Sequence, residues 1–392
     1  MLAGFLTPSG KGLPSAKPER AAAGHADGAR RRVAFGRCGD HGCRAAGCAR
    51  LLRVPLGRGG ATDATGMRGE TFTGPARRSA KAPKGLPGAA VQRSIEKANI
   101  MTPGWQRFAL GDARITTILD GTRHADGPHP TFGKDRSQEE MAALMRANFL
   151  PETRFVNGFT PTLIELANEL VLFDTGFGES GTANGYGKLV ERMAAAGTAP
   201  EAVTLVVLTH LHPDHILGLM TGGQPTFPNA RYATGAAEFE WWTSQEARTG
   251  ARAEMAKTVE SLVVPLRDRM TLLRDGDGVA PGITALDAPG HTPGHMVFEV
   301  ESAGQRLMLT ADTANHFVAS LQKPDWVVGF DMDPQKAIET RKRVFDRIAA
   351  ERIPFIGYHM PFPAIGYAEK LPDGGYRFVP VSYQLAIAGE KG

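Results

Sequence analysis

Cysteine is nearly absent from this chain of 392 residues, which contains three. All three lie near the amino terminus, at Cys38, Cys43 and Cys48, and residues 101–392 contain none. A fold held together by disulfides is therefore excluded for most of the chain. With 42% hydrophobic, 22% charged and 7% aromatic residues, the composition is that of an ordinary globular protein. It does not fit a membrane or fibrous protein.

A surplus of positive charge is missing from the larger part of the chain. The formal net charge is +4, but residues 1–100 contain 18 Lys and Arg against 6 Asp and Glu, which leaves 27 against 35 for residues 101–392. Nucleic-acid binding requires basic residues on the binding surface itself. We therefore expect neither nucleic acid nor a membrane as a partner of the folded part.

Residues 1–98 are rich in Ala, Gly, Arg and Pro, and their apolar residues follow neither the helical nor the strand period. We predict a disordered basic extension there and one folded domain over residues 99–392. The extension lacks the apolar stretch of an export signal. We interpret it as the result of a start codon assigned too far upstream, with Met67 and Met101 as later starts. We expect a cytoplasmic protein, with export or organelle targeting by the extension as the alternative.

Local patterns in the folded part alternate between strands and helices. The strand patterns cover residues 106–112, 114–121, 162–166, 170–174 and 203–209. The helical patterns cover residues 137–149 and 188–196. The run at 203–209 is apolar and β-branched throughout, which is typical of a strand that is covered on both faces.

Several histidines and aspartates come directly after predicted strands. His210 follows the strand at 203–209, and three more strand patterns, at 283–287, 306–310 and 353–357, lead to His291, Asp312 and His359. A rigid sheet holds side chains at strand ends, while the loops around them leave room for a substrate. We therefore expect the functional site at these strand ends.

The densest group of candidate ligands lies in the segment Thr209-His210-Leu211-His212-Pro213-Asp214-His215. In an extended segment His210 and His212 point to the same side and can bind one ion. Pro213 forces a turn, which brings Asp214 and His215 toward a second ion. Imidazole and carboxylate ligands together suit zinc, manganese or iron at a catalytic site. Imidazoles this close repel one another when protonated, unless a metal holds them neutral.

This segment resembles the HxHxDH motif of the metallo-β-lactamase superfamily. The later parts of that family's pattern are matched by Pro289-Gly290-His291, by Asp312 and by His359. The resemblance implies an α/β fold, the αββα sandwich, in which two mixed β-sheets are flanked by helices. It also implies two metal ions: the first held by His210, His212 and His291, the second by Asp214, His215 and His359, with Asp312 bridging them.

The resemblance assigns roles to other residues near the motif. Asp174 would accept a hydrogen bond from a ligand imidazole and so fix its tautomer. His295 is interpreted as a residue that stabilises its turn, because the ligand set is complete without it. For His316 two interpretations stay open, a side chain that lines the pocket or one that is exposed. The pocket wall is predicted to contain Trp242, Asn315, His316, Phe317 and Phe362, with burial in the core as the alternative for the aromatic residues.

Segments outside the motif resemble the methyl parathion hydrolase-like branch, among them Phe227-Pro228-Asn229-Ala230 and Tyr376-Arg377-Phe378-Val379-Pro380. A β-lactamase of the commonest dinuclear type would have a cysteine near Asp312, and the domain has none. Acyl-homoserine lactonases often have a tyrosine where this chain has Asn315. A lactonase would therefore need a different group to polarise the lactone carbonyl.

The resemblance implies a dinuclear hydrolase in which a hydroxide shared by two divalent ions attacks an ester-like bond of a small molecule, in a phosphotriester, a lactone or a carboxylic ester. We expect Asp214 and Asp312 to act in catalysis, and zinc to be the metal, with manganese or iron as alternatives. A mononuclear iron oxidoreductase of the persulfide dioxygenase kind is the alternative function, and a non-catalytic binding module is a third. Apolar faces at 105–119 and 376–383 predict a homodimer by resemblance.

Overall fold

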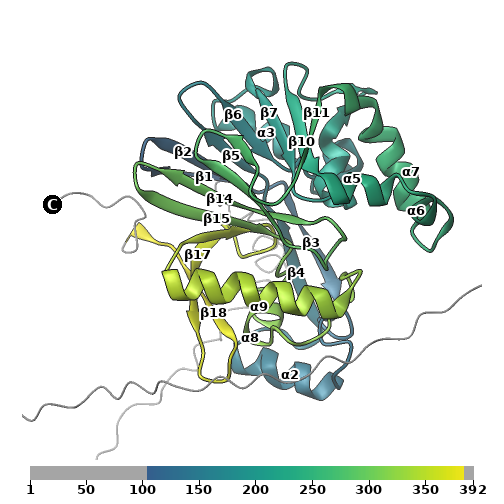
Figure 1. Cartoon of the computed structure of the whole chain (residues 1–392). Coiled ribbons are helices and arrows are strands. Elements are labelled where there is room, and N and C mark those ends of the chain that lie inside the picture. The colour runs from purple at the N-terminus through teal and green to yellow at the C-terminus, as the bar shows by residue number, and fades with distance from the viewer. Residues whose placement is uncertain (1–103, 384–392) are drawn as a thin grey trace, which may run out of the picture. The chain divides into compact units, whose positions relative to one another are not determined.

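The computed structural model describes residues 104–383, so the predicted extension over residues 1–98 lies outside the described part. Two sheets of seven strands each dominate this part (Figure 1). The first sheet contains, in spatial order, β1 (Trp105–Leu110), β2 (Ala113–Ile118), β5 (Thr162–Glu165), β6 (Leu170–Phe173), β7 (Leu205–Leu208), β10 (Arg231–Gly235) and β11 (Met270–Leu273). Its strands from β6 to β11 run parallel, and the others are antiparallel.

The second sheet is mixed as well. It contains, in spatial order, β12 (Gly278–Ala280), β13 (Ile283–Asp287), β14 (Met296–Ser302), β15 (Gln305–Ala311), β16 (Phe355–Gly357), β17 (Ile365–Lys370) and β18 (Tyr376–Pro380). Only β15 and β16 pair in parallel. Separate two-stranded ribbons pair β3 (Gly121–Asp126) with β4 (Arg154–Phe159), and β8 (Met220–Thr221) with β9 (Gln224–Pro225).

Alternation along the central strands explains the layers. In β7, Leu205 and Val207 pack into a core shared with the second sheet, while Val206 and Leu208 pack into a core on the opposite face. Successive strand residues point to opposite faces, so a strand that is apolar at every position is buried on both faces. The opposite core includes side chains of several helices, among them α3 (Leu189–Ala195), α5 (Ala236–Trp242) and α7 (Ala253–Leu262).

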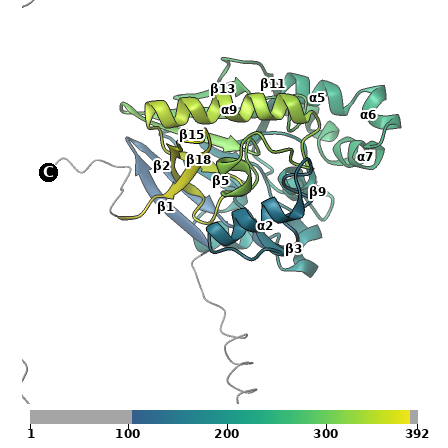
Figure 2. The same cartoon turned by 90° about the horizontal axis from the view of Figure 1, so that it is seen from below.

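Helices also cover the outer face of the second sheet. The longest, α9 (Pro334–Glu351), packs against β17 (Figures 1 and 2). It begins where the Asp333 side chain accepts a hydrogen bond from the Lys336 amide, with Pro334 in the first turn. It presents Val344, Phe345 and Ile348 to the core. The remaining helices are α2 (Gln138–Ala147), α4 (Pro213–Ile216), α6 (Gln245–Thr249) and α8 (Ala319–Gln322).

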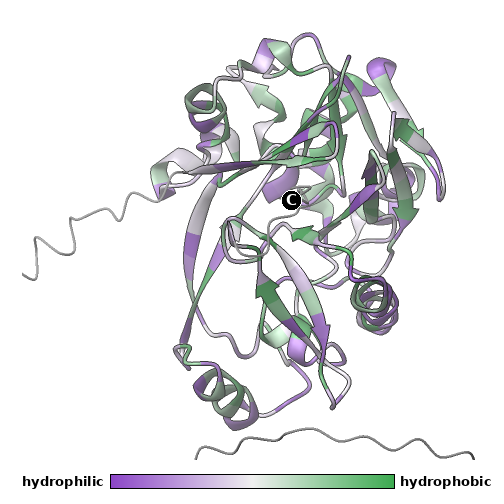
Figure 3. Ribbon diagram, turned by 90° about the vertical axis from the view of Figure 1, so that its left-hand side faces the viewer, coloured by the Kyte–Doolittle hydropathy of each residue, from purple (hydrophilic) through white to green (hydrophobic). Residues whose placement is uncertain are grey.

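Colouring by hydropathy shows green on many strand segments of the interior, while the helices carry both green and purple (Figure 3). This amphipathic pattern is expected of helices that cover sheets. The predicted αββα sandwich with two mixed sheets is confirmed. Each strand and helix predicted from the local patterns is present, with bounds that differ by a few residues.

β1 and β18, which fall within the segments predicted to form a homodimer, are edge strands of the two sheets. The homodimer itself stays a prediction. No helix within residues 104–383 combines the length and the apolar character needed to cross a membrane.

Candidate metal centre

Seven histidine and aspartate side chains meet where loops follow the strands of the two sheets. One group contains His210, His212 and His291, and the other contains Asp214, His215, Asp312 and His359. Within each group the potential ligand atoms lie within 4.8 Å of one another. The structure therefore brings together all seven residues that the sequence predicted as ligands, and in the two predicted groups.

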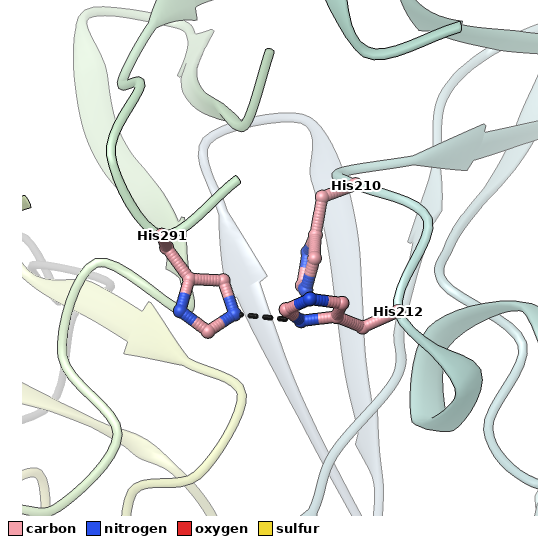
Figure 4. A group of neighbouring side chains, drawn as sticks. All are labelled: His210, His212 and His291. Carbon is pink, nitrogen blue, oxygen red and sulfur yellow. Dashed lines mark hydrogen bonds between the residues drawn. The ribbon is translucent and has the colours of Figure 1, made fainter. Parts of the chain in front are cut away.

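The first group joins two loops that are far apart in the sequence. His210 and His212 follow β7, and His291 follows β13. The Nδ1 atom of His212 lies 2.9 Å from Nε2 of His291, and the ring of His210 lies beside both (Figure 4). Burial lowers the pKa of His210 and of His212 well below the ordinary value, which favours the neutral rings that a metal ion requires.

The carboxylate of Asp312 contacts both groups. Its Oδ2 lies 3.3 Å from Nε2 of His291 and 3.1 Å from Nε2 of His359, and its Oδ1 lies 3.4 Å from Nε2 of His215. Burial opposes ionisation of Asp312, but the charges of His359 and His215 outweigh burial and hold its pKa well below the ordinary value. Asp312 is therefore an anion between two sets of imidazoles.

Unpaired buried atoms test whether metal ions fit this cluster. Nε2 of His210, Nε2 of His215 and Oδ1 of Asp312 are buried, and none has a hydrogen-bond partner among the described residues. Buried polar atoms without partners are costly and rare. These three atoms point into the cluster, and nitrogen and carboxylate oxygen are ligands that divalent cations accept. The residues present fit two such ions.

Asp174 contacts the imidazole of His215 at the ring nitrogen that does not face Asp312. Its Oδ2 lies 2.8 Å from Nδ1 of His215, and the amide and hydroxyl of Thr209 donate to the same carboxylate at 2.9 Å and 3.0 Å. Asp174 adopts a positive φ of 60°, in the left-handed region that side chains rarely occupy. The strained backbone turns this carboxylate toward His215, so the contact expected for Asp174 is present.

Asp331 is a positioning residue that the sequence did not indicate. Its Oδ1 lies 3.1 Å from Nδ1 of His291, and its Oδ2 accepts a 2.8 Å hydrogen bond from Arg341. Both side chains of this ion pair are fully buried. Burial alone lowers the pKa of His291, but Asp312 and Asp331 together raise it to about 9.

Glu238 on α5 was also missed. Its buried carboxylate accepts hydrogen bonds from the amides of Leu211 and Gly294, each at 2.9 Å, and from the hydroxyl of Thr292 at 2.7 Å. These donors belong to the two loops that carry the first histidine group. One carboxylate therefore joins both loops at a fixed separation.

Comparisons with known proteins agree with the motif in the sequence. Residues 160–349 match the family model described as the metallo-beta-lactamase superfamily. The chain contains a metallo-beta-lactamase superfamily domain. An N-acyl homoserine lactonase from a Bacillus species is 27% identical over 217 residues, which cover 50% of this chain and 79% of that relative.

Solved structures share the fold of this chain. AidC, described as a dizinc quorum-quenching lactonase, superimposes with a TM-score of 0.66 at 23% identity, covering 71% of this chain and 98% of its own. The hydrolase AbOPH superimposes with a TM-score of 0.66 at 25% identity, covering 72% of this chain and 99% of its own. The methyl parathion hydrolase-like branch remains a prediction.

A cavity of about 730 Å³ opens over the metal-ligand cluster of this superfamily domain. Its base is formed by His212, Asp214, His291, Asp312 and His359. Its apolar wall comes from Phe155 and Phe159 of β4, together with Phe177, Met255 and Phe330. The ribbon of β3 and β4 thus supplies much of the wall. Its strand pattern was not among those recognised in the sequence.

The residues predicted for the pocket wall do not line the cavity, and for Trp242 the alternative of burial in the core is correct; the predicted residues were Trp242, Asn315, His316, Phe317 and Phe362. Trp242 is fully buried and donates to Glu238, with its ring 6.0 Å from that of His212. Asn315 is fully buried and donates to Oδ2 of Asp312 at 2.9 Å. Both side chains support the ligands from within the core. They do not face the substrate.

His316 and its neighbours have structural contacts as well. Nδ1 of His316 accepts hydrogen bonds from the amides of Val318 and Ala319 at the start of α8, and burial lowers its pKa to about 4. His316 therefore neither lines the cavity nor is exposed, so both interpretations of this residue were wrong. Phe317 stacks on His316 with ring centroids 5.1 Å apart, and Phe362 is partly exposed.

The interpretation of His295 is confirmed. Its Nδ1 lies 3.1 Å from the Ala288 carbonyl, and its Nε2 accepts a 3.1 Å hydrogen bond from the Asp312 amide. Both ring nitrogens of His295 therefore have hydrogen-bond partners. Burial and the neighbouring His291 lower its pKa to about 3, so the ring is neutral.

Proposed function

We propose that this chain is a dinuclear metallohydrolase that cleaves ester bonds of small molecules, with lactones and carboxylic esters as its substrate class. The observation that carries the proposal is the position of Asp312, whose carboxylate contacts imidazoles of both groups at the base of a cavity. The similarity to N-acyl homoserine lactonases over half of this chain supports the reaction class.

In this proposal His210, His212 and His291 hold one ion, and Asp214, His215 and His359 hold the other, with Asp312 shared. Zinc is the proposed metal, because these ligands are imidazole and carboxylate and the structural relative AidC is described as a dizinc enzyme. When bound by these residues, such ions would act as Lewis acids and lower the pKa of water, which would supply a nucleophile near neutral pH.

The protein itself contributes orientation. Asp174 and Asp331 accept hydrogen bonds from one imidazole of each group, and the carbonyl of Gly158 lies 2.9 Å from Nδ1 of His359. Such partners fix the tautomer and the direction of a ligand ring. The hydroxyl of Tyr358 donates to the Asp214 carbonyl at 2.6 Å, which holds the short helix α4 against the site.

The alternative of a mononuclear iron oxidoreductase requires only one complete group. Here Asp214, His215 and His359 lie together with Asp312 as closely as the histidines of the first group lie together. A second complete group has no purpose in a single-iron enzyme, so the geometry favours the hydrolase.

The test is metal content by elemental analysis, combined with hydrolysis of a homoserine lactone, an aryl ester, an aryl phosphotriester and a cephalosporin. We expect about two zinc ions per chain and turnover of the lactone or the aryl ester. Asp312→Asn should lower both, whereas Asp287→Asn, at the end of β13 and outside the cavity, should lower neither. One iron per chain, with oxygen consumption and no hydrolysis, would replace the proposal by the oxidoreductase.

A further inference from the structure

Arginine is unusually frequent on the wall of the cavity above the metal cluster. Arg123, Arg154 and Arg252 all line it, and outside the metal-ligand cluster Asp126 is the acidic residue that lines it. A neutral substrate gains little from several guanidinium groups, which are strongly suited to carboxylate and phosphate groups. The wall therefore suggests a charge on the substrate.

Strand alternation separates these residues into two faces. In the ribbon of β3 and β4, Arg123 pairs with Asn157, and these two point to the same face as Phe155 and Phe159. That is the face with the aromatic wall of the cavity. Arg123 therefore extends from the same face as the residues that enclose the substrate.

Asp126 and Arg154 pair with each other across the ribbon and share its other face. The two are cross-strand neighbours, although they form no ion pair within the described residues. Arg123, by contrast, has the uncharged Asn157 as its cross-strand neighbour.

Arg252 approaches from the opposite side of the site. It immediately precedes α7, which packs against α4, the helix that contains Asp214 and His215. Arg252 is half-buried and lines the cavity together with His212 and Asp214. Its side chain therefore lines the same cavity as the metal-ligand cluster.

Neither guanidinium is neutralised by the protein. Among residues 104–383, no carboxylate forms an ion pair with Arg252, which is half-buried, or with Arg123, which is exposed, whereas Arg114 pairs with Glu165. A half-buried arginine beside a site that holds cations is electrostatically unfavourable without an anion. This consideration applies to Arg252, and an anionic group on a ligand would supply the missing charge.

We propose that the cavity binds esters or lactones that carry an anionic group, a carboxylate in the simplest case, with Arg252 and Arg123 as the residues that bind that group. The ester part of this inference rests on the proposed function, while the anion subsite rests on the arginines alone. The aromatic residues Phe155 and Phe159 enclose the apolar portion between the anion and the scissile bond.

The test compares two esters of equal length, para-nitrophenyl hemisuccinate with a terminal carboxylate and para-nitrophenyl butyrate with a terminal methyl group. The metal-loaded full chain should have a higher kcat/KM for the hemisuccinate. Arg252→Gln should lower the ratio of the two kcat/KM values roughly tenfold or more, the loss expected for one charge-assisted hydrogen bond. Arg252→Lys should retain part of the ratio, and Arg123→Gln should lower it as well.

Arg274→Gln is the matched control, because Arg274 is exposed on a turn and does not line the cavity; its ratio should equal that of the parent chain. Calorimetric binding of glutarate, compared with neutral glutaramide, provides a readout without hydrolysis. We expect glutarate to bind more tightly, and Arg252→Gln to remove most of the difference.

The outcomes separate the two proposals. If the butyrate ester is cleaved as well as the hemisuccinate and glutarate binding does not depend on Arg252, the anion subsite is wrong while the hydrolase stands. If neither ester is cleaved but glutarate binds in an Arg252-dependent manner, the subsite stands and the proposed reaction is wrong. If glutarate and glutaramide bind equally in every variant, the subsite is overturned whatever the activity.

Discussion

The imidazole of His291 lies 3.1 Å from the carboxylate of Asp331, and this contact is completely buried. Asp331 is in turn paired with Arg341 on α9. A helix that is far from the ligand loop in sequence therefore controls the direction of a ligand ring. Neither Asp331 nor Arg341 belongs to the HxHxDH segment.

Replacing Asp331 by Asn should weaken metal binding and destabilise the protein, because the change leaves the buried Arg341 without its counter-charge. Loss of one partner of a buried ion pair costs about 3–5 kcal/mol, and loss of a ligand's hydrogen-bond partner costs about 10–100-fold in metal affinity. Urea unfolding and metal titration measure the two effects. Asp325→Asn, at a half-exposed carboxylate, is the control and should change neither.

Glu238→Gln should loosen the two loops that carry the first histidine group. The glutamine amide nitrogen cannot accept the hydrogen bonds that one carboxylate oxygen accepts, so at least one buried donor loses its partner, at a cost of about 1–3 kcal/mol. The measurement is the free energy of unfolding, together with the metal content after dialysis. Glu240→Gln, two residues later on the same helix and exposed, should match the parent chain; an equal effect of both variants would contradict the role of Glu238.

His316 should make the domain less stable in acid. Burial lowers its pKa from 6.5 to about 4 in the folded protein, so the unfolded chain binds a proton first as the pH falls. The stability that depends on a neutral ring is present above about pH 6.5 and is lost as the pH falls toward 4. Between pH 7 and pH 5 this group should lower the free energy of unfolding by about 2 kcal/mol.

His316→Asn tests that value, because an asparagine oxygen can accept the same hydrogen bonds from Val318 and Ala319 without titrating. Unfolding at pH 7 and pH 5 should then show a smaller pH dependence than in the parent chain. An unchanged pH dependence would mean that the ring of His316 does not lose its proton on folding.

Removal of metal should lower the unfolding temperature reversibly, since Nε2 of His210, Nε2 of His215 and Oδ1 of Asp312 have no hydrogen-bond partner among the described residues. A ligand present at about a thousand times its dissociation constant stabilises the folded state by about 4 kcal/mol. Calorimetry with and without a chelator measures the shift, and added zinc should restore it. Asp312→Ala should respond little to the chelator; a full response would show that the metal binds elsewhere.

Much of the fold follows from local patterns. The run at 203–209 is apolar at every position, and this predicted a strand buried on both faces, as β7 is. The ligand set could also be predicted from the sequence, because four of the seven residues lie between His210 and His215 and the others follow strands. The pocket wall could not be predicted in this way. Aromatic residues near the motif were assigned to it, whereas Trp242 is buried in the core, Phe317 packs against the core, and much of the wall comes from β4.

The sequence by itself determined the chemistry of the site, because imidazoles and carboxylates spaced within one short loop can meet without any long-range information. Local periodicity also predicted the individual strands and helices, whereas the two-sheet sandwich was predicted through the resemblance of the motif to the metallo-β-lactamase superfamily. The tertiary structure alone decided which residues hold the ligands and which face the substrate. Asp331, Glu238 and Arg252 act across loops distant in the chain, and packing, not local spacing, sets such distances.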